Sequence, residues 1–214
     1  MAHLLHIDTS IRGDQSASRR LSALAADRWR AAHPDGTVTY RDFAVEPIPH
    51  LDGSGGLARM LPPDSHTPAQ AASFALSVEL IDEVKRADTL LLGLPLYNYG
   101  PPSTVKAWVD HLVAGGLSFD AETQAGLLGD TEFIVLAARG GGYAPGTPRH
   151  GWDHAETWLP HGVALTGLTP RFITADLTLA DSNPALAELR PLAADSMAAV
   201  ERSIDELWAK SKVA

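Results

Sequence analysis

The sequence predicts a doubly wound α/β fold, in which a parallel five-stranded sheet with the order 2-1-3-4-5 carries helices on both faces. Short apolar runs alternate along the chain with longer segments whose apolar residues recur every three or four positions, which is typical of βαβ units. The run Thr89–Leu94 is apolar almost throughout, as in a parallel strand that is buried on both faces. About five such runs fit this order better than a six-stranded dinucleotide-binding sheet.

The expected strands are short and are bounded by polar or turn-forming residues. They span Leu4–Asp8, Thr37–Arg41, Thr89–Leu94, Phe133–Ala138 and Arg171–Ala175. The first has no basic region before it, so it is expected to be a strand rather than a signal peptide.

Segments with helical spacing lie between these strands, and Trp29, Trp108 and Trp208 fall on their apolar faces, where we expect them to pack in the core. The expected helices span Ser18–Ala32, Pro68–Arg86, Ser103–Ala114, Trp152–Leu165 and Pro184–Trp208. Two other stretches, Glu46–His66 and Gly140–His150, are rich in Pro, Gly and His and are expected to be long functional loops.

The composition limits the possible functions. With 214 residues a single domain, 1–214, is expected, and the net charge of −9 argues against a nucleic-acid binder. The chain has no cysteine, so any redox activity must come from a bound cofactor or from a metal with other ligands. No apolar run approaches the roughly 18 residues of a membrane span, and a cytoplasmic location is expected.

The loop after the first strand, Thr9–Ser18, is rich in hydroxyl groups and immediately precedes a helix. The free N–H groups at a helix N-terminus suit a phosphate. Ser16 or Ser18 could instead simply cap the helix, but this does not account for Ser10 and Arg12. The spacing matches neither G-x-G-x-x-G nor G-x-x-x-x-G-K-[ST], so a terminal monophosphate fits best.

Two further loops follow the third and fourth strands. In Pro95–Gly100, Asn98 stands between two tyrosines and could hydrogen-bond the edge of a heteroaromatic ring, although a simple turn is the alternative. In Ala138–Tyr143, three glycines after Arg139 let backbone N–H groups approach a flat ligand, although a hinge is the alternative. Arg139 favours a ligand with anionic or carbonyl character.

The carboxyl ends of strands one, three and four are neighbours in the predicted order. A monophosphate, a ring edge and a ring face lined by backbone together describe FMN. The sequence therefore predicts an FMN site at this edge of the sheet.

Several motifs carry a resemblance to a known family over nearly the whole chain. They are the spaced serines Ser10, Ser16 and Ser18, the segment Arg41–Gly53, the segment Pro95–Tyr99 followed by Lys106–Asp110, and the Arg-Gly-Gly of Arg139–Gly141. In combination they resemble the FMN-dependent NADH:quinone oxidoreductases known as bacterial azoreductases.

The resemblance implies a flavodoxin-like fold, a homodimer, and FMN bound near the subunit interface. It also implies two half-reactions, in which NADH or NADPH reduces the flavin and the flavin then reduces a quinone or an aromatic azo compound. The flavin carries the chemistry, so no side chain is assigned as a catalytic residue. Separately, His150, His154 and His161 lie close together in the sequence but form no ligand set such as H-E-x-x-H, so no metal is expected. The implied cofactor-binding residues are Ser10, Ser16, Ala17, Ser18, Leu96, Tyr97, Asn98, Tyr99, Ala138, Arg139, Gly140 and Gly141.

Two other functions stay open on the sequence: a flavodoxin-type electron carrier without its own nicotinamide reaction, and a flavin-free regulatory module. The long loops at 46–66 and 140–150 argue against a carrier, which needs an exposed flavin rim rather than a deep acceptor pocket. Tyr143, His150 and the Trp152–Leu165 segment could shape such a pocket.

Overall fold

The predicted sheet is confirmed by the computed structural model, which describes residues 1–209; the last five residues of the expected domain lie outside this part. All five strands are parallel, in the order β2-β1-β3-β4-β5. The strands are β1 (His3–Asp8), β2 (Thr37–Asp42), β3 (Thr89–Pro95), β4 (Glu132–Ala138) and β5 (Pro170–Ala175). This is the flavodoxin-like arrangement.

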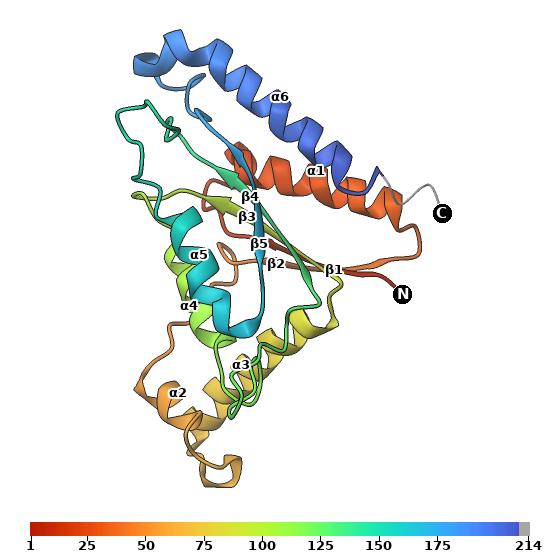
Figure 1. The fold of residues 1–214 in the computed structure, drawn as a ribbon. Coiled ribbons are helices and arrows are strands. Elements are labelled where there is room, and N and C mark those ends of the chain that lie inside the picture. Colours follow the sequence, from red (N-terminus) through yellow and green to blue (C-terminus); the bar gives the residue numbers. More distant parts are fainter. Residues whose placement is uncertain (210–214) are drawn as a thin grey trace.

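Helices cover both faces of the sheet (Figure 1). On one face lie α1 (Ala17–Ala32) and α6 (Arg190–Leu207), and on the other lie α3 (Pro68–Arg86), α4 (Ser103–Leu112) and α5 (Ala155–Val163). None of the helices within residues 1–209 is both long and apolar enough to cross a membrane.

The core has two halves, one on each side of the sheet. Successive residues of β3 point to opposite faces, so Leu90 and Leu92 pack with α3–α5 while Leu91 packs with α1 and α6. The prediction that Trp29, Trp108 and Trp208 serve packing is confirmed, because all three are buried in these halves.

The expectation of a loop throughout Glu46–His66 was wrong. The segment contains a short helix, α2 (Gly53–Ala58), whose first turn is capped by Asp52. This glycine-rich stretch forms a helix because it packs closely on α3: a Cβ atom on Gly55 would lie 2.3 Å from Ser73 Oγ.

Two predicted helices begin later than expected. The chain before Ala155 is not helical; instead, the Asp153 carboxylate accepts the N–H groups of Ala155 and Glu156 at the first turn of α5. The closing segment starts as a 3₁₀ helix, Pro184–Leu189, and α6 begins only at Arg190. Pro191 has no N–H group, so it cannot donate to the carbonyl four residues earlier as an α-helix through this point would require.

Candidate functional site

A cavity of about 640 Å³ opens at the carboxyl ends of the central strands, between the N-terminal ends of α1 and α6. It receives residues from the loops after β1, β3 and β4, as the strand order predicts. The predicted site residues that line it are Ser10, Ser16, Ala17, Ser18, Leu96, Tyr97, Ala138 and Gly140. Asn98, Tyr99, Arg139 and Gly141 lie in the same loops but do not line it.

The N-terminus of α1 forms one wall. Ser16 caps the helix, since its Oγ accepts the N–H of Arg19 at 3.3 Å, and it also lies 3.1 Å from Ser18 Oγ. The N–H groups of Ala17 and Ser18 have no acceptor within residues 1–209. Arg12 adds a cationic side chain to the same wall. Free N–H groups, hydroxyls and a cation at a helix N-terminus are the groups that suit an anion such as phosphate.

The loop after β3 is a tight turn. Tyr97 and Gly100 exchange two backbone hydrogen bonds of 2.9 and 3.0 Å, and the central residues Asn98 and Tyr99 have φ values of +48° and +66°. Both residues thus adopt the left-handed conformation of a type I′ turn. Asn98 is exposed at its tip.

Tyr97 connects this turn to the loop after β1. Its hydroxyl lies 3.0 Å from Ser10 Oγ and accepts the N–H of Ile11 at 3.1 Å. Tyr99 faces away from the cavity, and its ring meets the edges of Tyr143 and the half-exposed Trp152.

The glycine-rich loop after β4 is held by the segment after β5. Backbone N–H groups of residues 177–179 donate to the carbonyls of Arg139, Gly140 and Gly141. The N–H groups of Gly140 and Gly141 have no acceptor in the described part of the chain. A Cβ atom at Gly140 would lie 2.6 Å from Leu179 Cδ1, so a side chain there would require Leu179 to shift. The loop is therefore fixed and presents free N–H groups, as a flat ligand with carbonyl groups requires.

The Arg139 side chain is turned away from the cavity. Its guanidinium pairs with Asp153 at 2.9 Å, with Asp176 and with Glu156 at 3.2 Å. Burial raises the pKa of Glu156, against the effect of the nearby Arg139. Arg139 thus ties the loop to the segment just after β5 and to the start of α5, and its charge is already compensated.

One part of the cavity was not predicted from the sequence. Residues after β5 and at the start of α6 line it, among them Asp176, Leu177, Thr178, Leu179, Arg190 and Met197. The same rule that pointed to the other loops, that ligands bind beyond the carboxyl ends of parallel strands, applies to β5 and could have found them.

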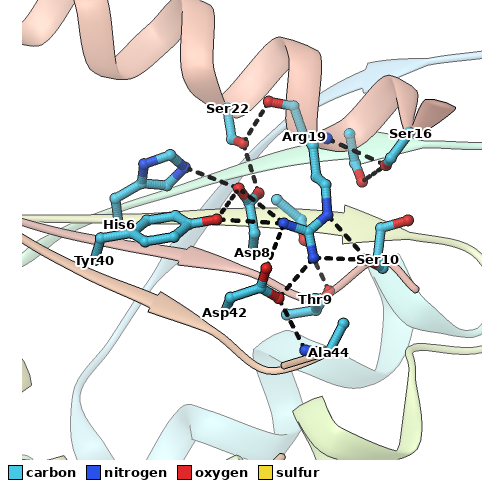
Figure 2. Close-up of polar contacts among 12 residues, drawn as sticks. His6, Asp8, Thr9, Ser10, Ser16, Arg19, Ser22, Tyr40, Asp42 and Ala44 are labelled. Carbon is cyan, nitrogen blue, oxygen red and sulfur yellow. Dashed lines mark hydrogen bonds and ion pairs between the residues drawn. The ribbon is translucent and has the colours of Figure 1, made fainter. Parts of the chain in front are cut away.

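A network of polar side chains lies beneath the loop after β1 (Figure 2). Asp8 is almost fully buried and accepts hydrogen bonds from Ser22 at 2.7 Å and from Tyr40 at 3.0 Å. Partial burial and the Asp8 carboxylate raise the pKa of Tyr40 to about 12. The hydrogen bond from Arg19 lowers the pKa of Asp42 below its usual range.

These features fit FMN. The N-terminus of α1 suits the phosphate, and the walls formed by Leu96, Tyr97, Ala138 and Gly140 suit the flat ring. The cavity volume is within the range of roughly 300–1,000 Å³ that is usual for cofactor sites.

Comparisons with known proteins agree with this geometry. A family profile described as a flavodoxin-like fold matches residues 2–193. The chain is 44% identical over 205 residues to an FMN-dependent NADH:quinone oxidoreductase of Frankia alni, covering 95% of this chain and 97% of that protein. It is 42% identical to a protein of the same name from Streptomyces coelicolor, covering 99% of this chain and 94% of that protein.

Solved structures show the same fold at lower sequence identity. An azoreductase of Bacillus anthracis superposes with a TM-score of 0.84 at 20% identity, covering 98% of this chain and all of that one. An FMN-dependent NADH-azoreductase of the same species, in complex with FMN, superposes with a TM-score of 0.77 at 19% identity, covering 96% and 99% of the two chains.

Proposed function

The chain belongs to the family of FMN-dependent NADH:quinone oxidoreductases, and from this premise we propose that it oxidises NADH and reduces quinones or aromatic azo compounds with FMN as its cofactor. The observation that carries the proposal is the cavity at the carboxyl edge of the sheet, which combines a helix N-terminus with a glycine-rich loop that has free N–H groups. When bound, FMN supplies the redox chemistry in two steps, taking a hydride from the nicotinamide and passing reducing equivalents to the acceptor.

Each loop has its own part in holding the cofactor. Ser10, Ser16, Ala17 and Ser18 would bind the phosphate through hydroxyls and through the free N–H groups of α1. The segments 96–99 and 138–141 would hold the ring, with Leu96 and Ala138 excluding water from its face. Asn98 and Arg139 would act mainly by shaping their loops, since neither side chain lines the cavity.

The N–H groups of Gly140 and Gly141 would have a second role. They are fixed by the backbone bonds of residues 177–179 before any ligand arrives. Donors that are oriented in advance stabilise negative charge without reorganisation. They would therefore favour the anionic form of the ring over the neutral one.

The proposal extends to assembly and location. We infer a single domain that forms a homodimer and acts in the cytoplasm, where NADH is available. Support for the dimer comes from Trp152 and Leu165, large apolar side chains whose exposed fractions are 48% and 45%. Light scattering on the purified protein tests it, and a monomer at micromolar concentration would refute it.

Steady-state kinetics test the function. The purified chain with added FMN should show a flavin spectrum and should oxidise NADH in the presence of a naphthoquinone or an azo dye. Ser16→Ala should weaken FMN retention, while Ser203→Ala, a change at a half-buried position of α6 that does not line the cavity, should leave it unaltered. Flavin binding without turnover above that of free FMN would indicate an electron carrier instead. A colourless protein that takes up no FMN would indicate a flavin-free module.

A further inference from the structure

Arg19 lies in the first turns of α1, yet its side chain does not line the cavity. The guanidinium runs beneath the loop after β1 and donates two hydrogen bonds to the carbonyl oxygen of Ser10, from Nε at 2.9 Å and from Nη2 at 2.8 Å (Figure 2). Arg19 therefore contacts the loop that is proposed to bind phosphate without touching the ligand space itself.

Asp42, at the end of β2, holds this guanidinium in place. Its two oxygens accept hydrogen bonds from Nη1 at 2.7 Å and from Nη2 at 2.6 Å, and Oδ1 also accepts the N–H of Ala44. Both side chains are largely buried, with exposed fractions of 16% and 17%. A paired, planar fork of this kind has little freedom to rotate, so the direction of its remaining donors is fixed.

The hydrogen bonds to Ser10 determine which way the next peptide faces. In a trans peptide the C=O and the following N–H point in opposite directions. Because the Ser10 carbonyl points toward Arg19, the N–H of Ile11 points away from it and donates to the Tyr97 hydroxyl at 3.1 Å. The same hydroxyl lies 3.0 Å from Ser10 Oγ. Arg19 thus fixes the orientation of the Ser10–Ile11 peptide, and with it the directions in which the Ser10 C=O and the Ile11 N–H point.

Arg19 also compensates negative charge near the anion site. Its Nη1 lies 3.8 Å from Asp8 Oδ2 in addition to its pairing with Asp42. Without the guanidinium, two carboxylates would stand behind the loop that is to receive a phosphate. At partly buried sites such like-charge repulsion is screened less than in bulk water.

We propose that Arg19, fixed by Asp42, is a positioning residue that selects for the phosphate group of the cofactor by orienting the Ser10–Ile11 peptide and by neutralising Asp8 and Asp42. The proposal rests on the proposed function, since it takes FMN as the ligand. The proposal predicts a difference that a purely structural role would not produce. Substitution of Arg19 should weaken the binding of FMN much more than the binding of riboflavin, which has the same ring but no phosphate.

Titration of the purified, flavin-free chain with each flavin tests this prediction, with quenching of flavin fluorescence as the signal. Arg19→Gln should raise the Kd for FMN by roughly 10- to 100-fold and the Kd for riboflavin by less than about threefold. Arg19→Lys keeps the charge but loses the fork, so its loss of FMN affinity should be intermediate. Arg41→Gln is the matched control, because Arg41 also pairs with two carboxylates, Glu79 and Glu83, but does not contact the loop after β1. It should change neither Kd.

The outcomes separate the two proposals. Equal weakening of FMN and riboflavin in the Arg19 variants, or no weakening of either, would overturn the positioning role. A wild-type chain that binds both flavins equally would overturn it as well, while leaving flavin binding intact. A wild-type chain that binds neither would refute the proposed function and this inference with it. If Arg19→Gln shows no cooperative melting transition, the test rests on Arg19→Lys. The proposal would then be overturned if the ratio of the riboflavin Kd to the FMN Kd in Arg19→Lys equals the ratio in the wild type.

Discussion

Gly93 on β3 lies directly beside Asp8 on β1, and the two residues are partners in the sheet register. A Cβ atom at position 93 would lie 2.3 Å from Asp8 Oδ1 and 3.1 Å from Ser22 Oγ. Asp8 is short, almost fully buried and bonded to Ser22, so it cannot simply swing aside. Gly93→Ala is therefore expected to disturb the polar network beneath the loop after β1.

The magnitude follows from three contributions. Overpacking a well-packed interior costs about 1–3 kcal/mol. Loss of the hydrogen bond from Ser22 to the Asp8 carboxylate costs about 1.5–3 kcal/mol. Alanine in place of glycine within a strand stabilises the fold by about 0.5–1 kcal/mol, which offsets part of this loss. The free energy of unfolding of Gly93→Ala should accordingly fall by about 1.5–5.5 kcal/mol.

Urea denaturation followed by circular dichroism measures this change. Gly56→Ala is the matched control, because its added Cβ atom meets nothing within 4 Å and it lies in a helix. That variant should be unchanged or slightly more stable. If Gly93→Ala loses no more than about 0.5 kcal/mol, as an ordinary surface substitution would, then Asp8 is not held against β3 as described.

Three further perturbations bear on the same region. Arg19 holds the pKa of Asp42 below its unfolded value, so the pair stabilises the fold fully above about pH 4, and this stabilisation is lost as the pH falls through the lowered pKa. Asp42→Asn should therefore lose less stability than the wild type between about pH 5 and about pH 3 in urea titrations, and equal losses would contradict the pairing. Ser16→Ala removes the cap of α1 and should cost about 1 kcal/mol of unfolding free energy, with unchanged stability in Ser203→Ala as the comparison. Asn98→Ala should raise the Kd for FMN by roughly tenfold because alanine is strained at positive φ, whereas Asn98→Gly should retain most of the affinity; equal loss in both would assign the effect to the side chain instead.

Local rules were sufficient for most of the secondary structure. The helix expected over Pro68–Arg86 has the same bounds in the structure, because Thr67 and Gln70 form a capping box and Pro68 takes the first helical position. The strands were predicted from apolar or β-branched runs to within one residue at either end. Their order could then be predicted, since alternating strands and helices favour a parallel sheet with few arrangements.

Segments whose conformation depends on a distant partner were not predictable in this way. The helix α2 is rich in glycine, which disfavours helices, and it forms where it packs against α3. The direction of the Arg139 side chain is set by Asp153, Asp176 and Glu156, and nothing in the local sequence distinguishes this from an arginine that faces a ligand.

By itself, the sequence determined the sheet, its order and the loops that meet at its carboxyl edge, because periodicity and capping act over a few residues. Only the tertiary structure decided which groups in those loops face the cavity and which face each other. Arg19 and Asp42 are 23 residues apart and Ser10 and Tyr97 are 87 apart, so their hydrogen bonds exist only once β2, β1 and β3 are aligned in register. Side-chain direction across a sheet is set by that alignment, and no local pattern encodes it.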